Sequence, residues 1–380
     1  MMIPFNKPYI PSATIRYCNQ VFEQNVSLFK GYFANKCLQY LQNNFQFTHC
    51  FLTASCTDAL YFSALLLDIK KGDEVIVPSF CFVSVANVFA NLGATIVLID
   101  SSPSNPNLDI HSLESLITSK TKAIVFITYA GHAENIDQVQ KIAKQKGIYL
   151  IEDAAHGFGA EYSQKMVGSF GDIATFSFHE TKNITCGQGG LMVINNSSLL
   201  TKAETIANHG SNRLDMERGV ITNYSWVSKG AEFNLSEISC AVLFSQFEKE
   251  KLITQKRIQL WNEYYKGLKS LELQHFFVLP AIQKNNHNGH IFYLRILDVS
   301  KRDALIQFLQ SKGIHAYTHY EPLHLSAYFV KHYHKVSLPN AELLSKQIIR
   351  LPLYYELQKK QVTFIIQQIH QYFMNISYQN

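Results

Sequence analysis

The sequence has little of what marks membrane, secreted or nucleic-acid-binding proteins. No apolar run reaches the roughly 18 residues that a membrane helix needs. Residues 1–8 lack the charged, apolar and small-residue regions of a signal peptide. The 34 basic and 29 acidic residues leave a net charge of only +5, and no lysine and arginine run forms a nucleic-acid footprint. We therefore expect a soluble, cytoplasmic protein that binds neither membranes nor nucleic acid.

Paired cysteines and metal-ligand clusters are also missing. The seven cysteines are odd in number and include no C-x-x-C pair, which indicates free thiols in a reducing compartment. The 15 histidines are scattered, and neighbours such as His332 and His334 are typical of a solvated surface. We expect no metal site.

Alternating apolar and helical segments occupy the first half of the chain. The length of 380 residues suits one large domain and a smaller one. Continuous apolar runs predict strands at 74–78, 95–100, 123–129, 149–153, 173–178 and 191–194. Segments with the period of a helix lie between most of them, at 57–67, 110–117, 136–144 and 199–207. Continuous apolar strands joined by helix-length crossovers predict an α/β fold with a parallel sheet covered on both faces.

The pattern changes beyond residue 234. Residues 235–268 are expected to form one long helix that connects two domains, because they contain no proline and no glycine before Gly267. The tail mixes an expected strand at 291–296 with expected helices at 302–312, 341–349 and 360–373. We predict a large domain at 1–245 and a smaller α+β domain at 246–380.

Lys182 is the first candidate for chemistry. It lies just beyond the strand that ends near Phe178 and before the glycine-rich turn at 187–190. A lysine there can project into a cleft at the sheet edge, where a pyridoxal-phosphate (PLP) enzyme needs an amine to carry the cofactor and move a proton. A single lysine after a strand is, however, usually an ordinary surface residue.

Asp153 is the second candidate. The apolar run 148–151 leads into it, so it falls at the carboxyl end of a parallel strand, where ligands bind. A buried carboxylate beside a pyridine nitrogen keeps that nitrogen protonated, as PLP chemistry requires. The alternative interpretation is a helix cap or turn residue.

Two further segments could contact a cofactor. Residues 53–60 run from a strand into a helix, so the N–H groups near Thr57 and Asp58 could bind a phosphate, although a simple N-cap by Ser55 or Thr57 explains the segment equally well. Phe82 follows a strand and could stack on a ring or simply pack in the core.

The order of these motifs resembles that of the DegT family of sugar-nucleotide aminotransferases. The resemblance extends from Ile3 to the last helix, and its most specific parts are Phe176-Ser177-Phe178-His179, Lys182-Asn183 and Glu152-Asp153-Ala154-Ala155. It implies the aspartate-aminotransferase architecture (PLP fold type I), with PLP as cofactor.

The resemblance also implies roles for individual residues. Lys182 would carry PLP as a Schiff base, and Asp153 would hold the pyridinium. His156 would contact the 3-hydroxyl side of the ring, and Phe82 would stack on its face. The Thr57 and Asp58 amides and the Ser177 hydroxyl would bind the phosphate. Asn234 would reach the phosphate of the other subunit's cofactor, which implies a homodimer with shared active sites.

Within the family, the pattern is most similar to that of transaminases that convert dTDP-4-keto-6-deoxyglucose to dTDP-4-amino-4,6-dideoxygalactose, with glutamate as the expected donor. The segments that carry this similarity include 179–183, 210–213, 224–226, 320–324 and 351–355. Cys186-Gly187-Gln188 and Asn234 depart from that subfamily. The nucleotide, the ring carbon and the stereochemistry therefore stay open.

Several alternatives remain at this point. A 3-keto sugar and a UDP-linked 4-keto-6-deoxy-N-acetylhexosamine are competing substrates. PLP-dependent sugar dehydratases carry histidine at the position of Lys182, and a binding module without activity would be expected to lose Lys182 or Asp153.

The diphosphate of a sugar nucleotide needs a few well-placed donors. Arg213 can bind phosphate oxygens with its guanidinium. Tyr320 and His324 are expected to approach the substrate from the small domain. The competing interpretation is that Arg213 is an exposed loop charge and His324 a packed histidine.

Overall fold

The computed structural model describes residues 2–23, 28, 30–281 and 287–377, and its centre is a seven-stranded sheet in the order β1-β9-β8-β5-β4-β2-β3. Strands β3, β2, β4, β5 and β8 pair in parallel, and β9 pairs antiparallel with β8 and β1. The strands are β1 (Cys50–Thr53), β2 (Glu74–Pro78), β3 (Thr95–Ile99), β4 (Thr121–Ile127), β5 (Tyr149–Asp153), β8 (Ile173–Ser177) and β9 (Gly190–Ile194). The predicted α/β fold with a mostly parallel sheet is confirmed.

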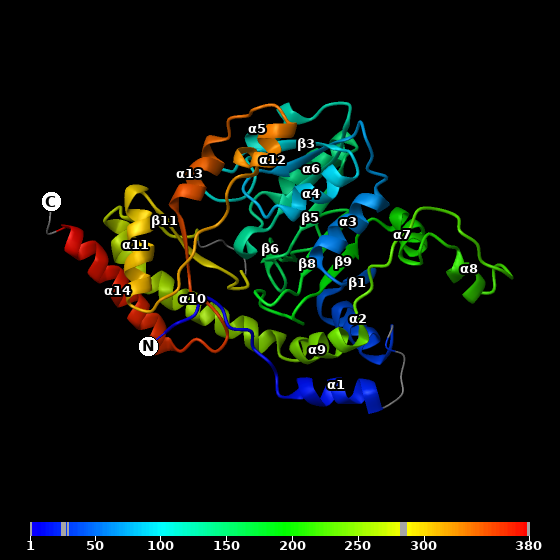
Figure 1. Cartoon of the computed structure of the whole chain (residues 1–380), viewed down its shortest axis with the longest axis horizontal. Helices are drawn as coiled ribbons and strands as arrows, with labels where there is room; N and C mark the ends of the chain where they lie inside the picture. The colour runs from blue at the N-terminus through cyan, green and yellow to red at the C-terminus, as the bar shows by residue number, and fades with distance from the viewer. Residues whose placement is uncertain (1, 24–27, 29, 282–286, 378–380) are drawn as a thin grey trace.

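Both faces of the sheet are buried, which explains its uninterrupted apolar strands. Along β2, Val75 and Val77 enter one apolar cluster, and Ile76 enters the other. The first cluster includes residues of α3 (Cys56–Leu66), α4 (Ser84–Asn91) and α7 (Leu200–Ala207). The second includes residues of α2 (Tyr32–Phe45), α5 (Ile110–Leu116), α6 (Ile136–Lys146) and α9 (Glu237–Phe247). Figure 1 shows these helices around the sheet.

Strand β9 is antiparallel to β8 because of the short connection between them. Residues 178–189 join β8 to β9 as a loop without a helix, so the chain turns back beside β8. A parallel strand at that place would need a crossover that returns to the other end of the sheet, usually through a helix, and no helix lies between β8 and β9.

The predicted long helix at 235–268 is two helices. Helix α9 ends at Phe247 and α10 (Glu250–Leu273) begins three residues later, so Gly267 lies inside α10. Helix α9 is fixed at its start by Glu237, a fully buried carboxylate that accepts the N–H groups of Gly31, Phe33 and Ala34 at the start of α2. Helix α10 then crosses to the other part of the molecule (Figure 1).

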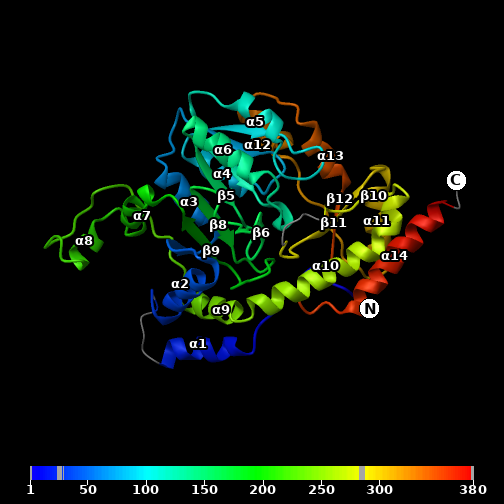
Figure 2. The ribbon, with the colours of Figure 1, turned by 180° about the vertical axis from the view of Figure 1, so that it is seen from behind.

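The second part has its own core. Its sheet consists of β10 (Phe277–Val278), β11 (Phe292–Ile296) and β12 (Ile348–Leu351), and α10, α11 (Ser300–Ser311) and α14 (Lys359–Ser377) pack on it. Figure 2 shows α10, α11 and α14 side by side. Ile3 also belongs to this core, because its N–H donates to Gly313 at 2.8 Å and its carbonyl accepts from His315 at 3.1 Å. The boundary after residue 245 stays a prediction.

An arm projects from the first part between α7 and α9 and carries α8 (Arg213–Glu217), as Figures 1 and 2 show. Gly210 closes its base: the Gly210 carbonyl accepts from the N–H groups of Val227 and Ser228 at 2.8 and 2.9 Å. A Cβ on Gly210 would lie 2.0 Å from the Ser228 carbonyl oxygen, so only glycine fits. The arm leaves Trp226 82% exposed.

The smaller elements of the described chain include α1 (Ala13–Glu23), β6 (Glu161–Tyr162), β7 (Lys165–Met166), α12 (Ala327–His332) and α13 (Pro339–Gln347). Within the described ranges, no helix combines the length and the hydropathy that a bilayer crossing requires.

Candidate active site

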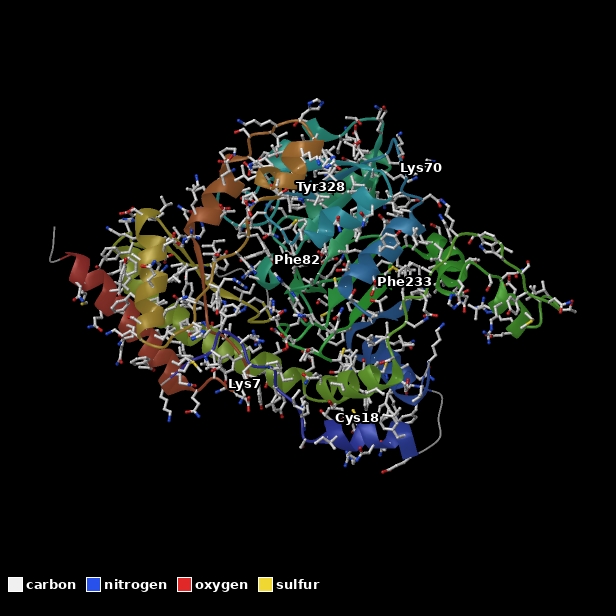
Figure 3. The ribbon with its side chains drawn as sticks, in the orientation of Figure 1. Lys7, Cys18, Lys70, Phe82, Phe233 and Tyr328 are labelled. Carbon is white, nitrogen blue, oxygen red and sulfur yellow. The ribbon has the colours of Figure 1, made fainter. Side chains whose placement is uncertain are left out.

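A cavity of about 760 Å³ lies where the carboxyl ends of the parallel strands meet the second part of the molecule. This is within the usual range of ligand pockets. Ile127, Asp153 and Ser177 line it from the ends of β4, β5 and β8, and Arg350 and Leu351 line it from β12. Figure 3 labels Phe82, another lining residue, near the middle of the molecule.

Lys182 enters this cavity from the loop between β8 and β9. The loop is fixed by backbone hydrogen bonds, among them Phe178 N–H to Gly189 at 2.8 Å and Lys182 N–H to His179 at 2.9 Å. Burial lowers the pKa of Lys182 to about 8, although the negative charge of Asp153 acts in the opposite direction. A large share of this amine is therefore neutral near pH 8 and able to accept a proton.

Asp153 is the last residue of β5 and is 4% exposed. One carboxylate oxygen accepts the Ala155 N–H at 3.0 Å. Burial raises the pKa of Asp153, while that hydrogen bond and the charge of Lys182 lower it. The structure thus places Asp153 and Lys182 in one cavity, although 29 positions separate them in the sequence.

Two neutral histidines border the same space. Burial, helped by the charge of Lys182, lowers the pKa values of His156 and His290 well below their usual range. Nδ1 of His156 accepts the Ala130 N–H at 3.3 Å, so its proton is on Nε2. Nδ1 of His290 lies 2.8 Å from Oδ1 of Asn183, whose Nδ2 donates elsewhere, so His290 carries its proton on Nδ1.

The N-terminus of α3 borders the cavity through Cys56 and Thr57. Ser55 caps this helix, because its Oγ accepts the Asp58 N–H at 3.0 Å. Strand β9 passes directly against the cap: a Cβ on Gly190 would lie 2.4 Å from the Ser55 carbonyl carbon and oxygen. The first turn of α3 is therefore held against β9, with the positive end of the helix dipole at the cavity.

The remaining predicted cofactor residues differ in placement. Ser177, Phe82 and His156 line the cavity. Asp58 does not line it, and its side chain accepts the Ser55 hydroxyl at 2.8 Å. Asn234 does not line it either, and its N–H donates to Glu232 at 3.1 Å beside β1.

The three predicted substrate residues lie in different places. Tyr320 lines the cavity, and its ring stacks on His319 at 3.8 Å. Arg213 lies on α8 in the projecting arm, outside the cavity of its own chain, and pairs with Glu217 at 2.8 Å.

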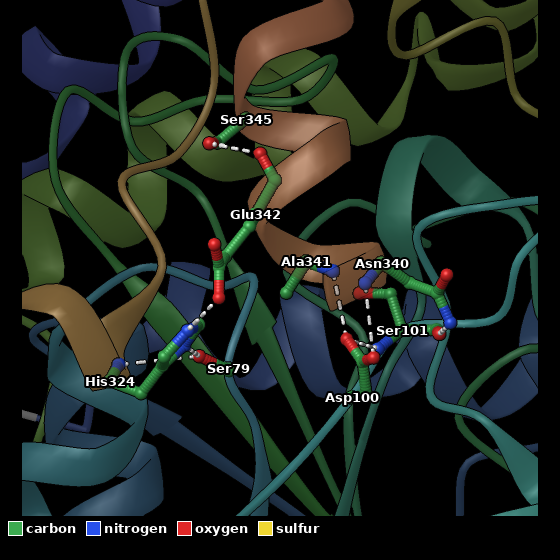
Figure 4. Close-up of polar contacts among 8 residues, drawn as sticks. All are labelled: Ser79, Asp100, Ser101, His324, Asn340, Ala341, Glu342 and Ser345. Carbon is green, nitrogen blue, oxygen red and sulfur yellow. Dashed lines mark hydrogen bonds and ion pairs between the residues drawn. The ribbon is translucent and has the colours of Figure 1, made fainter. Parts of the chain in front are cut away.

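His324 is buried in a polar relay outside the cavity (Figure 4). Its Nδ1 lies 2.8 Å from Ser79 Oγ, and its Nε2 lies 3.2 Å from Glu342. Because Ser79 follows β2 and Glu342 belongs to α13, the relay joins the end of β2, α13 and the segment that carries Tyr320.

Sequence reasoning missed several lining residues, among them Arg257, His290, His319 and Arg350. Arg350 immediately precedes Leu351-Pro352-Leu353, a segment that carried the family resemblance, and this was the available signal. His290 and Arg257 gave no such signal, because both reach the cavity only through tertiary packing. Among the described residues, no cluster of three or more His, Cys, Asp or Glu side chains is arranged to hold a metal ion.

The cavity has the groups that PLP requires. Lys182 offers an amine to the aldehyde, Asp153 offers a buried carboxylate to the ring nitrogen, and the N-terminus of α3 offers N–H groups to the phosphate. The close passage of Gly190 leaves no side chain between β9 and that helix end. The residues present fit the cofactor.

Comparison with known proteins gives the same result. The model of the DegT/DnrJ/EryC1/StrS aminotransferase family matches residues 8–370. An uncharacterized protein of Methanocaldococcus jannaschii is 33% identical over 328 residues, which cover 83% of each chain.

Solved structures superpose over nearly the whole chain. The Helicobacter pylori aminotransferase PseC, involved in the biosynthesis of pseudoaminic acid, is 26% identical, with a TM-score of 0.90 over 99% of this chain and 100% of the other. The PLP form of Spr1654 from Streptococcus pneumoniae, assigned as a sugar aminotransferase, is 25% identical, with a TM-score of 0.87 over 97% of each chain. The chain belongs to the DegT/DnrJ/EryC1/StrS aminotransferase family and is a PLP-dependent sugar aminotransferase.

Proposed function

We propose that the protein moves the amino group of glutamate to the 4-keto group of a nucleotide-linked 6-deoxysugar, converting dTDP-4-keto-6-deoxyglucose to dTDP-4-amino-4,6-dideoxygalactose. The observation that carries this proposal is the placement of the subfamily motifs. His179, Lys182, Tyr320 and Leu351 come from three separate segments of that pattern, and all four line the cavity.

The cofactor would be held by residues from several elements. Lys182 would attach it, Asp153 would hold its ring nitrogen, and Phe82 would cover its ring. Thr57, Asp58 and Ser177 would hold its phosphate, of which Thr57 and Ser177 line the cavity. When bound, PLP supplies an aldehyde that condenses with amines and a ring that withdraws electrons from the adjoining carbon.

The proton transfers fall to Lys182. Its pKa of about 8 lets the free amine remove a proton from the donor carbon and later return one to the sugar carbon. Asp153 is buried, and its carboxylate would stabilise a protonated nitrogen of the cofactor ring. His156 carries its proton on Nε2, so it can donate a hydrogen bond to an oxygen on the ring's 3-hydroxyl side.

The enzyme is proposed to be a homodimer with shared sites. The arm exposes Val220, Tyr224, Trp226 and Val227, an apolar group that a second subunit would cover. Asn234 at the root of the arm is proposed to reach the partner's cofactor phosphate, and Arg213 the partner's substrate diphosphate. Both lie outside the cavity of their own chain.

The remaining assignments complete the proposal. Tyr320 contacts the sugar from inside the cavity. The contact of His324 with substrate stays a prediction, and its bonds to Ser79 and Glu342 would position the Tyr320 loop. The division at residue 245 and the cytoplasmic location are also retained as proposals.

A substrate panel tests the proposal. Purified enzyme with PLP and L-glutamate is given dTDP-4-keto-6-deoxyglucose, its 3-keto isomer or the UDP-linked 4-keto-6-deoxy-N-acetylhexosamine, and the products are identified by NMR. We expect amination at C4 of the dTDP sugar at the highest kcat/KM. A higher kcat/KM for either alternative would replace the proposed substrate.

A further inference from the structure

The loop at residues 288–290, which belongs to the second part of the molecule and leads into β11, reaches the wall of the cavity. Its polar side chains are buried: Asn288 is 1% exposed and His290 is 7% exposed, and His290 lines the cavity. Buried polar groups form hydrogen bonds in stable proteins, so the partners of this loop show what it holds in place. Those partners lie in the segments that follow β5 and β8, the two strands that lead to Asp153 and Lys182.

Asn183 ties the residue after Lys182 to this loop through both ends of its side-chain amide. Nδ2 donates to the Asn288 carbonyl at 2.9 Å, and Oδ1 lies 2.8 Å from Nδ1 of His290. A carbonyl oxygen only accepts, so Oδ1 must face His290 and accept the proton of Nδ1. Asn183 is 7% exposed, whereas residues 179–181, which precede the lysine, are exposed. The buried amide of Asn183 therefore anchors the peptide that carries Lys182.

This loop is itself held on two sides. Arg257, on the helix α10 that crosses between the two parts (Figure 1), donates to the carbonyls of Gly289 and His290 at 3.1 and 2.8 Å. Gly289 has a φ of +61°, and a Cβ there would lie 2.8 Å from the Arg257 carbonyl carbon, so this close approach requires glycine. On the other side, Nδ2 of Asn288 donates to two carbonyls in the segment 156–158, at 2.8 and 2.9 Å. The loop is therefore a fixed support.

We propose that His290 is a positioning residue for Lys182 and acts through its hydrogen bond to Asn183. The inference deepens the proposed function, because it rests on Lys182 attaching the cofactor and moving the protons. Proton transfer requires the amine within hydrogen-bond reach of the proton that it takes, and a displacement of about 1 Å can lower the rate about 100-fold. His290 contributes no atom to the transfer in this assignment. It fixes the backbone from which the lysine side chain extends.

Two substitutions separate the two nitrogens of His290. The amide nitrogen of H290N takes the place of Nδ1 and can still donate to Asn183, whereas that of H290Q takes the place of Nε2 and cannot. At saturating L-glutamate, we expect H290Q to lower the single-turnover rate of the PLP-loaded enzyme about 10- to 100-fold, with little change in the glutamate concentration that gives half the maximal rate. H290N should stay within about threefold of the wild type. The control is Y264F, which removes another buried hydrogen bond, from Tyr264 to the Pro352 carbonyl at 2.9 Å, and should leave the rate unchanged.

Asn183→Ala tests the same bond from its other end. N183A should show the loss seen in H290Q, and adding H290Q to N183A should lower the rate by no more than about a further twofold, because the two residues act as a unit. The second readout involves no substrate: cofactor-free protein is mixed with PLP, the bond is fixed with borohydride, and the labelled Lys182 peptide is quantified by mass spectrometry. We expect H290Q and N183A to slow this labelling about 10-fold or more. The melting temperature of each cofactor-free variant shows that it is folded.

Equal losses in H290N and H290Q, or a full loss from H290Q in the N183A background, would overturn the proposal, since His290 would then act on a ligand or on the fold. Lower melting temperatures in H290Q and N183A with unchanged rates and labelling would overturn it too, because the bond would then only stabilise the protein. No sugar nucleotide enters either measurement, so an error in the assigned sugar leaves the proposal standing. A wild type that rejects glutamate would contradict the proposed donor, and the labelling rates would still decide the role of His290. Labelling of another lysine in the wild type would overturn both this proposal and the assignment of Lys182.

Discussion

Gly190→Ala tests the phosphate site without removing any functional group. The added Cβ would lie 2.4 Å from the Ser55 carbonyl carbon and oxygen and 2.6 Å from the Cys56 nitrogen. Carbon contacts are normally about 3.5–4.0 Å, so the start of α3 or strand β9 must move by roughly 1 Å. Overpacking of this kind costs about 1–3 kcal/mol. Because the first turn of α3 is proposed to hold the phosphate, about half of that cost should appear as PLP affinity weakened roughly 2- to 10-fold.

The assay removes the cofactor and titrates the protein with PLP, following the absorbance of bound PLP and, separately, the melting temperature without cofactor. Gly187→Ala is the control. A Cβ there has no atom within 4 Å, and its φ of +84° should cost about 1 kcal/mol of stability without moving α3. If Gly190→Ala lowers the melting temperature and leaves PLP affinity at the wild-type value, the N-terminus of α3 does not bind the phosphate.

Four other predictions follow from the site and the fold. Lys182→Ala should bind PLP weakly and show no transamination, and turnover close to wild type would contradict its assignment. Asp153→Asn should keep the fold but lose most of the rate of the half-reaction with glutamate, measured by stopped flow. An undiminished rate would show that Asp153 is only a structural turn residue. Lys182→Ala subunits mixed with Asn234→Asp subunits should regain activity, since a heterodimer rebuilds one intact site; no recovery despite proven subunit exchange would count against cross-subunit donation. Glu237→Gln should lower the free energy of unfolding by about 1.5–3 kcal/mol, because an amide replaces a buried carboxylate that accepts three N–H groups. If a urea titration shows a loss of less than about 0.5 kcal/mol, Glu237 does not fix the start of α9 in this way.

The sequence was informative where function depends on the end of a strand. Asp153 and Lys182 each follow an apolar run, and parallel strands bring such ends to one edge of a sheet. Their shared cavity was therefore predictable from local pattern. The direction of β9 was not, because residues 178–189 had to be recognised as a connection without a helix.

Residues that depend on tertiary packing escaped prediction. Arg350 and His290 reach the cavity from the second part of the molecule, and their approach depends on how α10 and the 288–290 loop dock. The break between α9 and α10 was also missed, since neither proline nor glycine marks Glu248 and Lys249. Local pattern cannot distinguish one straight helix from two packed on different cores.

The pairing of Ile3 with residues 313–315 bears on the order of folding. These hydrogen bonds join positions about 310 residues apart, and the intervening segment must be synthesised before they can form. The last strand of the seven-stranded sheet in sequence order is β9, which ends at Ile194. The strands of this sheet can therefore pair before Ile3 pairs with residues 313–315. The same segment carries Phe5, against Arg350, and Asn6, whose side chain donates to the Glu180 carbonyl at 3.1 Å beside Lys182. The catalytic cavity is thus completed only after the residues between Asn6 and Gly313 have been synthesised, by a segment that precedes the whole sheet in the sequence.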